Sequence, residues 1–160
     1  IEAAALLVST WSGRFRVVIV GEGSQKEALQ ELIRTHDLEN IVTLVGRMSP
    51  LKIRALLAQA DAAVFPSLYE TTPLTLLEAW AARVPVITTS VGILRDAPDN
   101  FIAAYIVASQ DASSLTKAMN DCMVDEVARS TIAANGLAEV QKYSWLRTAQ
   151  TAEAIYRSAQ

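Results

Sequence analysis

The chain has few of the residues that build disulfide frameworks, metal sites or aromatic surfaces. Its 160 residues include one cysteine, Cys122, and one histidine, and aromatic residues make up only 6%. A single cysteine excludes an internal disulfide and favours a reducing compartment, and Cys122 falls in a helical stretch where we interpret it as a packing residue. Because the sequence has no Asp-x-Asp pair and no grouped Cys or His, we expect no metal site.

Runs of one charge sign and long apolar runs are also absent. The net charge is −3 and no Lys/Arg-rich run occurs, which argues against nucleic acid as a partner. No apolar stretch reaches the roughly 20 residues of a membrane span, and no signal peptide is recognisable, so we expect a cytoplasmic protein. The chain begins with Ile1 inside a helical pattern, and we therefore expect a piece of a longer protein.

The composition, with 51% hydrophobic and 19% charged residues, is that of a folded domain. The length suits one domain with a sizeable core. The pattern predicts strands over residues 15–20, 41–45, 62–65, 85–89 and, more weakly, 103–107. It predicts helices up to about Trp11 and over 25–36, 50–59, 73–83, 112–123, 126–142 and 145–158. Such alternation indicates an α/β fold, a doubly wound, Rossmann-like parallel sheet covered on both faces.

Ligands of such sheets bind at the carboxyl ends of the strands. Four polar residues directly follow predicted strands and are therefore expected to share one edge of the sheet. They are Glu22, Arg47, Ser67 and Glu70.

Two acids, Glu70 and Glu78, bracket a helix start within a long apolar run. Pro73 is predicted as the first helical residue, with Thr72 as its N-cap. The helix body from Leu74 to Ala82 is apolar nearly all round, which predicts a largely buried helix. Because helical side chains lean toward the N-terminus, we expect Glu78 to point back toward Glu70.

The first-turn amides of Leu74 and Thr75 lack helical acceptors and lie at the positive end of the helix dipole, which favours an anion. An anion flanked by two carboxylates fits a ligand that carries both phosphate and hydroxyl groups, such as a nucleotide sugar. The residues alone leave a second interpretation open. Glu70 would then be an acid favoured near a helix N-terminus, and Glu78 a paired, buried acid.

Several stretches together resemble one family, the carboxyl-terminal domain of GT-B glycosyltransferases of family four, also called group 1. The resemblance covers roughly residues 15–158 and is most specific over 60–88. The matching stretches are Val18-Ile19-Val20-Gly21-Glu22-Gly23, Val42-Thr43-Leu44-Val45-Gly46, Ala60-Asp61-Ala62-Ala63-Val64-Phe65-Pro66-Ser67, Glu70 to Glu78, Val84-Pro85-Val86-Ile87-Thr88 and Tyr143-Ser144-Trp145.

The resemblance implies the C-terminal half of a GT-B fold and a donor-binding domain for a nucleotide diphosphate sugar. The parent enzyme would transfer the sugar, with retention, to an acceptor hydroxyl in glycan, polysaccharide or glycolipid synthesis. The nucleotide diphosphate sugar is a substrate, and no cofactor is implied. The first strand, the family's phosphate-binding Arg and Lys and the N-terminal acceptor domain would all precede Ile1, so the chain alone should transfer little sugar. The alternative is a non-catalytic nucleotide-binding or interaction domain of the same fold.

The resemblance also assigns roles to residues. Glu70 would act catalytically on hydroxyls of the transferred sugar, and Glu78 would bind the ribose. The remaining donor-binding positions would be Thr71, Thr72, Leu74, Thr75, Ser67, Met48, Arg47, Gly21 and Gly23.

For some of these positions the sequence also allows an interpretation in which the residue has a structural role and does not bind donor. The Gly21–Gly23 turn is not a dinucleotide fingerprint, because Lys26 stands where the third glycine belongs, and it can be read as a tight turn. Arg47 can be a solvated residue at a strand exit, and Ser67 can cap its turn. The chain departs from the family pattern at Pro73 and Arg83, where glycines are usual.

Overall fold

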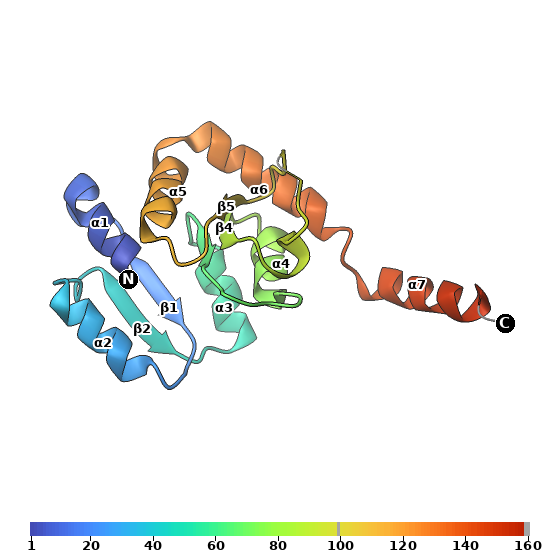
Figure 1. Ribbon diagram of the computed structural model, residues 1–160, viewed down its shortest axis with the longest axis horizontal. Helices are drawn as coiled ribbons and strands as arrows, with labels where there is room; N and C mark the ends of the chain where they lie inside the picture. Colours follow the sequence, from blue (N-terminus) through green and yellow to red (C-terminus); the bar gives the residue numbers. More distant parts are fainter. Residues whose placement is uncertain (99, 159–160) are drawn as a thin grey trace.

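The computed structural model describes residues 1–98 and 100–158 and has the predicted alternation of strands and helices (Figure 1). The strands are β1 (Val17–Val20), β2 (Val42–Gly46), β3 (Ala63–Phe65), β4 (Val86–Thr89) and β5 (Tyr105–Val107). The helices are α1 (Glu2–Trp11), α2 (Lys26–Thr35), α3 (Pro50–Leu57), α4 (Leu74–Ala81), α5 (Ala112–Val124), α6 (Glu126–Val140) and α7 (Trp145–Ser158). The 3-10 turn η1 (Gly92–Leu94) was not predicted.

All strand pairs are parallel, which confirms the α/β class, and the strands form two parallel sheets. β1 pairs with β2, and β3, β4 and β5 form a separate sheet in that order. In the described part of the chain, no strand connects β1 to β3. Both strands therefore keep one edge whose backbone groups are free to pair.

The three-stranded sheet is covered on both faces, as predicted. On one face α4 packs through Leu76, Ala79 and Trp80 against Ala63 and Val86. On the other face α5 contributes Ala118 and the fully buried Cys122, which pack against Ile87 and Val107. Burial raises the pKa of the Cys122 thiol to about 11, in agreement with its prediction as a packing residue.

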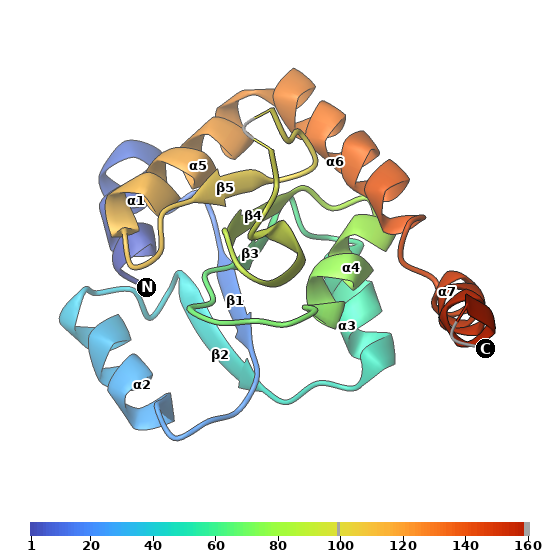
Figure 2. The ribbon, with the colours of Figure 1, turned by 45° about the vertical axis from the view of Figure 1, so that its right-hand side comes forward.

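The β1–β2 pair is covered on one face only. α1 and α2 supply Ala4 and Ile33, which pack with alternate residues of the strands. The opposite face leaves Val18, Val20 and Val45 about 40% exposed, so the predicted cover on both faces fails here. α1 also packs against α5, where the indole nitrogen of Trp11 donates to Asn120 Oδ1 at 3.1 Å (Figure 2).

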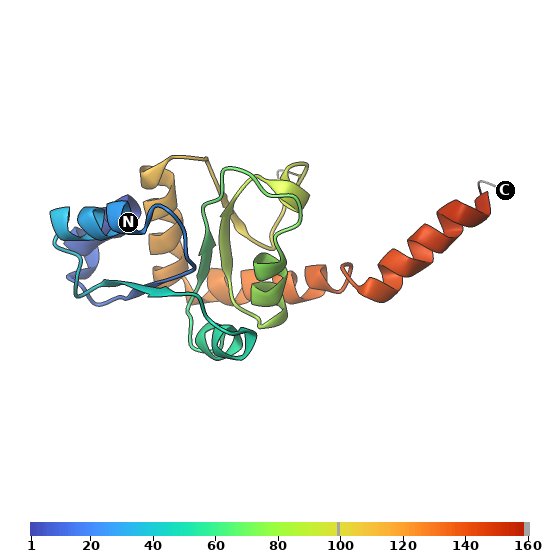
Figure 3. The same cartoon turned by 90° about the horizontal axis from the view of Figure 1, so that it is seen from below.

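The last helix, α7, extends away from the rest of the molecule (Figure 3). It follows Tyr143 and Ser144, as predicted, and none of its residues is buried. Two of its aromatic side chains, Trp145 and Tyr156, are 84% and 74% exposed. No helix in the described residues is both long enough and apolar enough to cross a membrane.

Candidate functional site

The loop from β3 to α4 carries the first acid of the predicted pair. Ser67 Oγ donates a hydrogen bond to Glu70 Oε1 at 3.1 Å, and both residues are half-buried. Thr71 and Thr72 follow as exposed residues. The hydroxyl of Ser67 thus contacts the carboxylate of Glu70, and the predicted role of Ser67 in donor binding stays a prediction.

The start of α4 differs from the prediction. Pro73, not Thr72, is the N-cap, and no side chain caps the helix. The carbonyl of Pro73 accepts hydrogen bonds from the amides of Leu76 and Leu77, at 3.0 and 3.2 Å. A prolyl φ of −73° with ψ of 94° places this residue just outside the helix, with its backbone extended. Thr72 is exposed instead.

The amides of the first helical turn remain available. Among the described residues, the amide nitrogens of Leu74 and Thr75 donate no hydrogen bond. Leu74 is 65% exposed and Thr75 is also exposed, so the first turn of α4 lies at the surface. The positive end of the helix dipole adds to their attraction for an anion.

Glu78 lies one turn further along α4 and is exposed. The prediction of a largely buried helix is wrong, because α4 buries only the face of Leu76, Ala79 and Trp80. The interpretation of Glu78 as a paired, buried acid is wrong as well, since no ion pair involves it among the described residues. No hydrogen bond joins Glu78 to Glu70, and their convergence around a ligand stays a prediction.

A second group of predicted residues meets at the ends of β1 and β2. The amide of Gly21 donates to the carbonyl of Gly46 at 2.9 Å, and both glycines have positive φ, 136° and 69°. Arg47 Nε lies 3.5 Å from Glu22 Oε2, and both side chains are mostly exposed. This ion pair in solvent contributes little stability. The role of Arg47 in donor binding stays a prediction.

Gly23 and Met48 complete this second group. Gly23 is exposed, and a side chain at this position would meet no atom within 4 Å. Met48 is half-buried directly after Arg47. No hydrogen bond or ion pair in the described part of the chain connects this group to the loop of Glu70.

Sequence reasoning missed three residues that support the Glu70 loop. Thr88 and Thr89, at the end of β4, are each only 2% exposed, and their hydroxyls donate to the carbonyls of Phe65 and Ser67. Gly92 lies in η1 against the loop, where a Cβ would come within 2.7 Å of the carbonyl oxygen of Thr71. The signal in the sequence was a pair of hydroxyl residues that ends an apolar strand, because buried hydroxyls need a partner.

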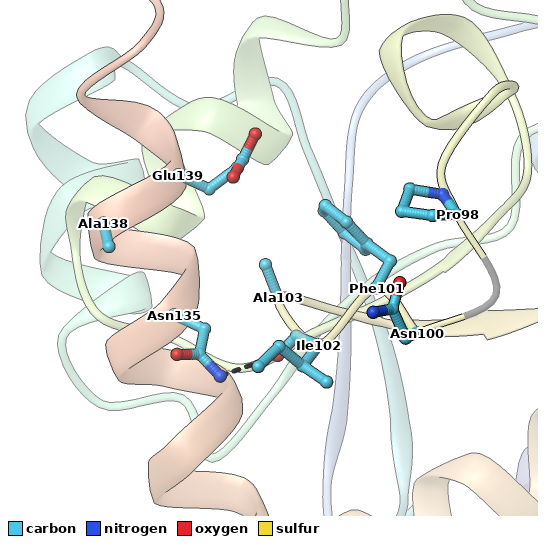
Figure 4. A pocket seen from close by; sticks show the side chains of 8 residues that line it. All are labelled: Pro98, Asn100, Phe101, Ile102, Ala103, Asn135, Ala138 and Glu139. Carbon is cyan, nitrogen blue, oxygen red and sulfur yellow. Dashed lines mark hydrogen bonds between the residues drawn. The ribbon is translucent and has the colours of Figure 1, made fainter.

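Two cavities lie near the sheet, and neither is lined by Glu70 or Glu78. One of about 350 Å³ is bordered by the carboxyl ends of β3 to β5 and by α1, α2 and α5; Leu68 and Thr89 are among its walls. The other, of about 240 Å³, lies between the segment before β5 and α6 (Figure 4). There Asn135 Nδ2 donates to the carbonyl of Ile102 at 3.1 Å, and Glu139, the one charged residue among the described residues of the lining, pairs with Lys142. The second cavity is at the amino end of β5, and the described residues that line it are mostly apolar.

No group of three or more acidic, His or Cys side chains with metal-binding proximity occurs within residues 1–98 and 100–158.

The chain belongs to the family described as glycosyl transferases group 1, whose sequence model matches residues 1–138. It is 32% identical over 146 residues to a glycogen synthase of Mycobacterium tuberculosis, covering 89% of this chain and 35% of that protein. The chain thus spans little more than a third of this relative's length.

Solved structures agree with this assignment. Sucrose-phosphate synthase of Thermosynechococcus elongatus superposes with a TM-score of 0.80 at 25% identity, over 99% of this chain and 42% of that one. The Anabaena protein HepE, solved in complex with UDP-glucose, gives a TM-score of 0.79 at 21% identity, over 99% of this chain and 44% of that one. The fold is therefore that of GT-B glycosyltransferases.

Proposed function

We propose that the chain is the donor-binding domain of a retaining glycosyltransferase, which transfers a sugar from a nucleotide diphosphate sugar to an acceptor hydroxyl. The observation that carries the proposal is the arrangement around α4. The loop before it holds Glu70 through Ser67, its first amides are free, and its exposed face presents Glu78. A donor has matching groups, namely sugar hydroxyls, a diphosphate and ribose hydroxyls.

In this proposal Glu70 accepts hydrogen bonds from hydroxyls of the transferred sugar, and Glu78 accepts from the ribose. The amides of Leu74 and Thr75 bind the diphosphate, helped by the helix dipole. Ser67, Thr71 and Thr72 lie in the loop before α4 and would contact the donor through their hydroxyls and backbone. The exposure of Thr71 and Thr72 supports their access to a ligand.

The second group would receive the nucleotide base. Met48 offers an apolar side chain to the base, and the Gly21–Gly23 turn with Arg47 would complete the donor cleft. The absence of side chains at Gly21 and Gly23 supports a close approach of ligand to backbone, since a Cβ at either position would face open space.

The chemistry needs the bond between the anomeric carbon and the diphosphate oxygen to break. The electron pair leaves with the diphosphate, the acceptor oxygen bonds to the carbon, and the acceptor proton passes to the departing diphosphate. Preorganised amides at the start of α4 would stabilise the negative charge that develops on this leaving group. Neither glutamate acts as a nucleophile, and no cofactor takes part.

The parent protein would also contain a first strand and an N-terminal acceptor domain that precede Ile1. The free edges of β1 and β3 support this proposal, because one additional parallel strand between them would join the two sheets. The length of the relatives supports it as well. The single cysteine supports a cytoplasmic location, with products in glycan, polysaccharide or glycolipid synthesis.

The test measures UDP binding and sugar transfer from UDP-glucose by the full-length enzyme. HepE was solved with UDP-glucose, which makes this donor the first choice. Glu78→Ala should weaken UDP binding about 10- to 100-fold, the effect of removing a hydrogen bond to a charged group. Glu70→Gln should bind UDP normally but transfer sugar far more slowly. Glu31→Ala, which removes an exposed glutamate paired with Arg34 on α2, is the matched control.

Unchanged UDP affinity in Glu78→Ala would refute the ribose assignment. UDP binding without any sugar transfer or donor hydrolysis by the full-length protein would instead favour the alternative, a non-catalytic nucleotide-binding domain. A response to GDP or ADP in place of UDP would keep the proposal and change the base.

A further inference from the structure

The end of β4 contains a feature that the donor-binding roles leave unexplained. Thr88 and Thr89 are the only polar residues among the buried side chains of the described chain, each 2% exposed. Burying a hydroxyl is unfavourable unless it forms a hydrogen bond. β4 is the central strand of its sheet, so valine would suit both positions at least as well for packing alone.

Both hydroxyls donate to the backbone that leaves the neighbouring strand. Thr88 Oγ1 donates to the carbonyl of Phe65 at 3.1 Å, and Thr89 Oγ1 donates to the carbonyl of Ser67 at 2.5 Å. These carbonyls lie where β3 ends and the loop toward Glu70 begins. The Thr88 bond reinforces the last ladder pair, Phe65 with Thr88, and the Thr89 bond continues the β3–β4 contact beyond it.

The second bond leads directly to the acid. Thr89 binds the carbonyl of Ser67, and the hydroxyl of the same Ser67 donates to Glu70 Oε1 at 3.1 Å. A buried core residue is thus connected to a candidate catalytic carboxylate through one intermediate residue. The side chain of Ser67 can hold this carboxylate in place only if its own backbone is fixed.

The turn that follows β4 supports the loop at a second place. Gly92 has a φ of 57°, and a Cβ there would lie 2.7 Å from the carbonyl oxygen of Thr71 and 3.3 Å from that of Glu70. The backbone of η1 therefore lies directly against the backbone at Glu70, at a distance that only glycine permits. Thr89 and Gly92 support the loop on the two sides of Glu70.

We infer that Thr89 is a positioning residue for sugar transfer, which acts through Ser67 on the carboxylate of Glu70. This inference rests on the proposed function of Glu70. The diphosphate and the ribose are assigned to α4, which lies outside the hydrogen-bonded series from Thr89 to Glu70. Loss of the Thr89 hydroxyl should therefore lower kcat and leave the binding of UDP almost unchanged.

The experiment uses the full-length enzyme with UDP-glucose as the varied substrate. Thr89→Val keeps the shape of the side chain and removes the hydroxyl, and Thr89→Ser restores the hydroxyl. The expected loss in kcat for Thr89→Val is about 10-fold or more, within the roughly 100-fold that a displacement of about 1 Å can cause. The affinity for UDP, which lacks the sugar that Glu70 contacts, should stay within about twofold, and Thr89→Ser should recover most of kcat.

Two controls separate positioning from damage to the fold. Thr116→Val removes a hydroxyl of α5 that lies within hydrogen-bond distance of the carbonyls of Ala112 and Ala3, and should leave kcat unchanged. Titration calorimetry with UDP gives the fraction of binding-competent protein. A smaller stoichiometry in Thr89→Val would mean that the protein is partly unfolded, and a kcat loss that disappears after this correction would overturn the inference.

The remaining outcomes distinguish this inference from the proposed function. If Glu70→Gln impairs transfer but Thr89→Val has the activity of the unmodified enzyme, the positioning role is refuted and the proposed function stands. If Glu70→Gln has full activity, both are refuted. Failure of Thr89→Ser to recover kcat would also contradict the role of the hydroxyl.

Discussion

Replacing Gly136 with alanine tests the packing that fixes the position of α4. Gly136 is buried in α6, and a Cβ there would overlap Cδ1 of Trp80 and lie 2.9 Å from its Nε1. The indole of Trp80 has little freedom to move, because it is fully buried and its Nε1 donates to the carbonyl of Ala103 at 2.9 Å. Either α6 must move away from α4 or this hydrogen bond must be distorted.

Opposing effects determine how much Gly136→Ala changes the free energy of unfolding. Alanine in place of a helical glycine gains up to about 1 kcal/mol from helix propensity. Overpacking typically costs about 1–3 kcal/mol, and a buried hydrogen bond that is lost costs about 1–3 kcal/mol. If both costs apply, we expect Gly136→Ala to lower the free energy of unfolding by about 1–5 kcal/mol, because the steric terms exceed the gain in propensity.

Urea unfolding followed by far-UV circular dichroism measures this difference. Ala134→Gly, at an exposed position of α6, is the control for the backbone and should cost only about 1 kcal/mol. Adding Trp80→Phe should cost less in the Gly136→Ala background than in the unmodified protein, because the smaller ring leaves room for the methyl group. An unfolding midpoint for Gly136→Ala equal to or above that of the unmodified protein would refute the steric argument.

Two further predictions concern Cys122 and the exit of α4. Since burial raises the pKa of the Cys122 thiol to about 11, Ellman's reagent at pH 8 should modify the folded protein far more slowly than the urea-unfolded protein; equal rates would contradict a packing role. Arg83→Gly should stabilise the protein by about 1 kcal/mol in urea unfolding, because Arg83 has a φ of 58° at a helix C-terminus where glycine is favoured. Arg83→Ala keeps the unfavourable backbone and should not show this gain; stabilisation by both variants would point to charge instead.

Most of the fold could be predicted from periodicity and turn residues. The strands and long helices were predicted to within a few residues, because alternating apolar segments record burial directly. The separation into two sheets could not be predicted in this way. Pairing between β1 and β3 depends on which strand lies between them, and an apolar pattern does not distinguish a paired edge from a free one.

The candidate site was predicted in part. Glu70 and Glu78 were recognised as charges within an apolar run, and the resemblance gave them roles. The degree of burial of α4 was predicted incorrectly, because Leu74 is apolar in sequence but 65% exposed in the structure. Hydropathy reports what a side chain prefers, whereas a binding helix can expose leucine and alanine on the side that faces a ligand or another domain. Thr89 could not be identified from the sequence, because the observation that distinguishes it is its hydrogen bond to Ser67. That residue is 22 positions away, and a local pattern does not show which distant residues meet.

The supports of α4 explain how one short helix can combine a rigid position with free donors. At its C-terminus the amides of Arg83 and Val84 donate to the carbonyls of Trp80 and Ala79, so the helix end is satisfied by its own backbone. Its buried face is fixed by the indole of Trp80 against α6. None of these contacts uses the amides of Leu74 and Thr75, which remain unpaired.

Preorganised donors stabilise a developing charge best when they do not have to move during the reaction. The division of α4 into a fixed buried face and an unpaired first turn meets this condition. It also predicts how the two classes of variant should differ. Changes at Gly136 should reach the site by shifting the whole helix, and so affect UDP affinity, whereas the loss of the Thr89 hydroxyl should act on Glu70 and leave UDP affinity intact. A Gly136→Ala protein that is folded but binds UDP as tightly as the unmodified enzyme would show that the core and the site are not coupled through α4.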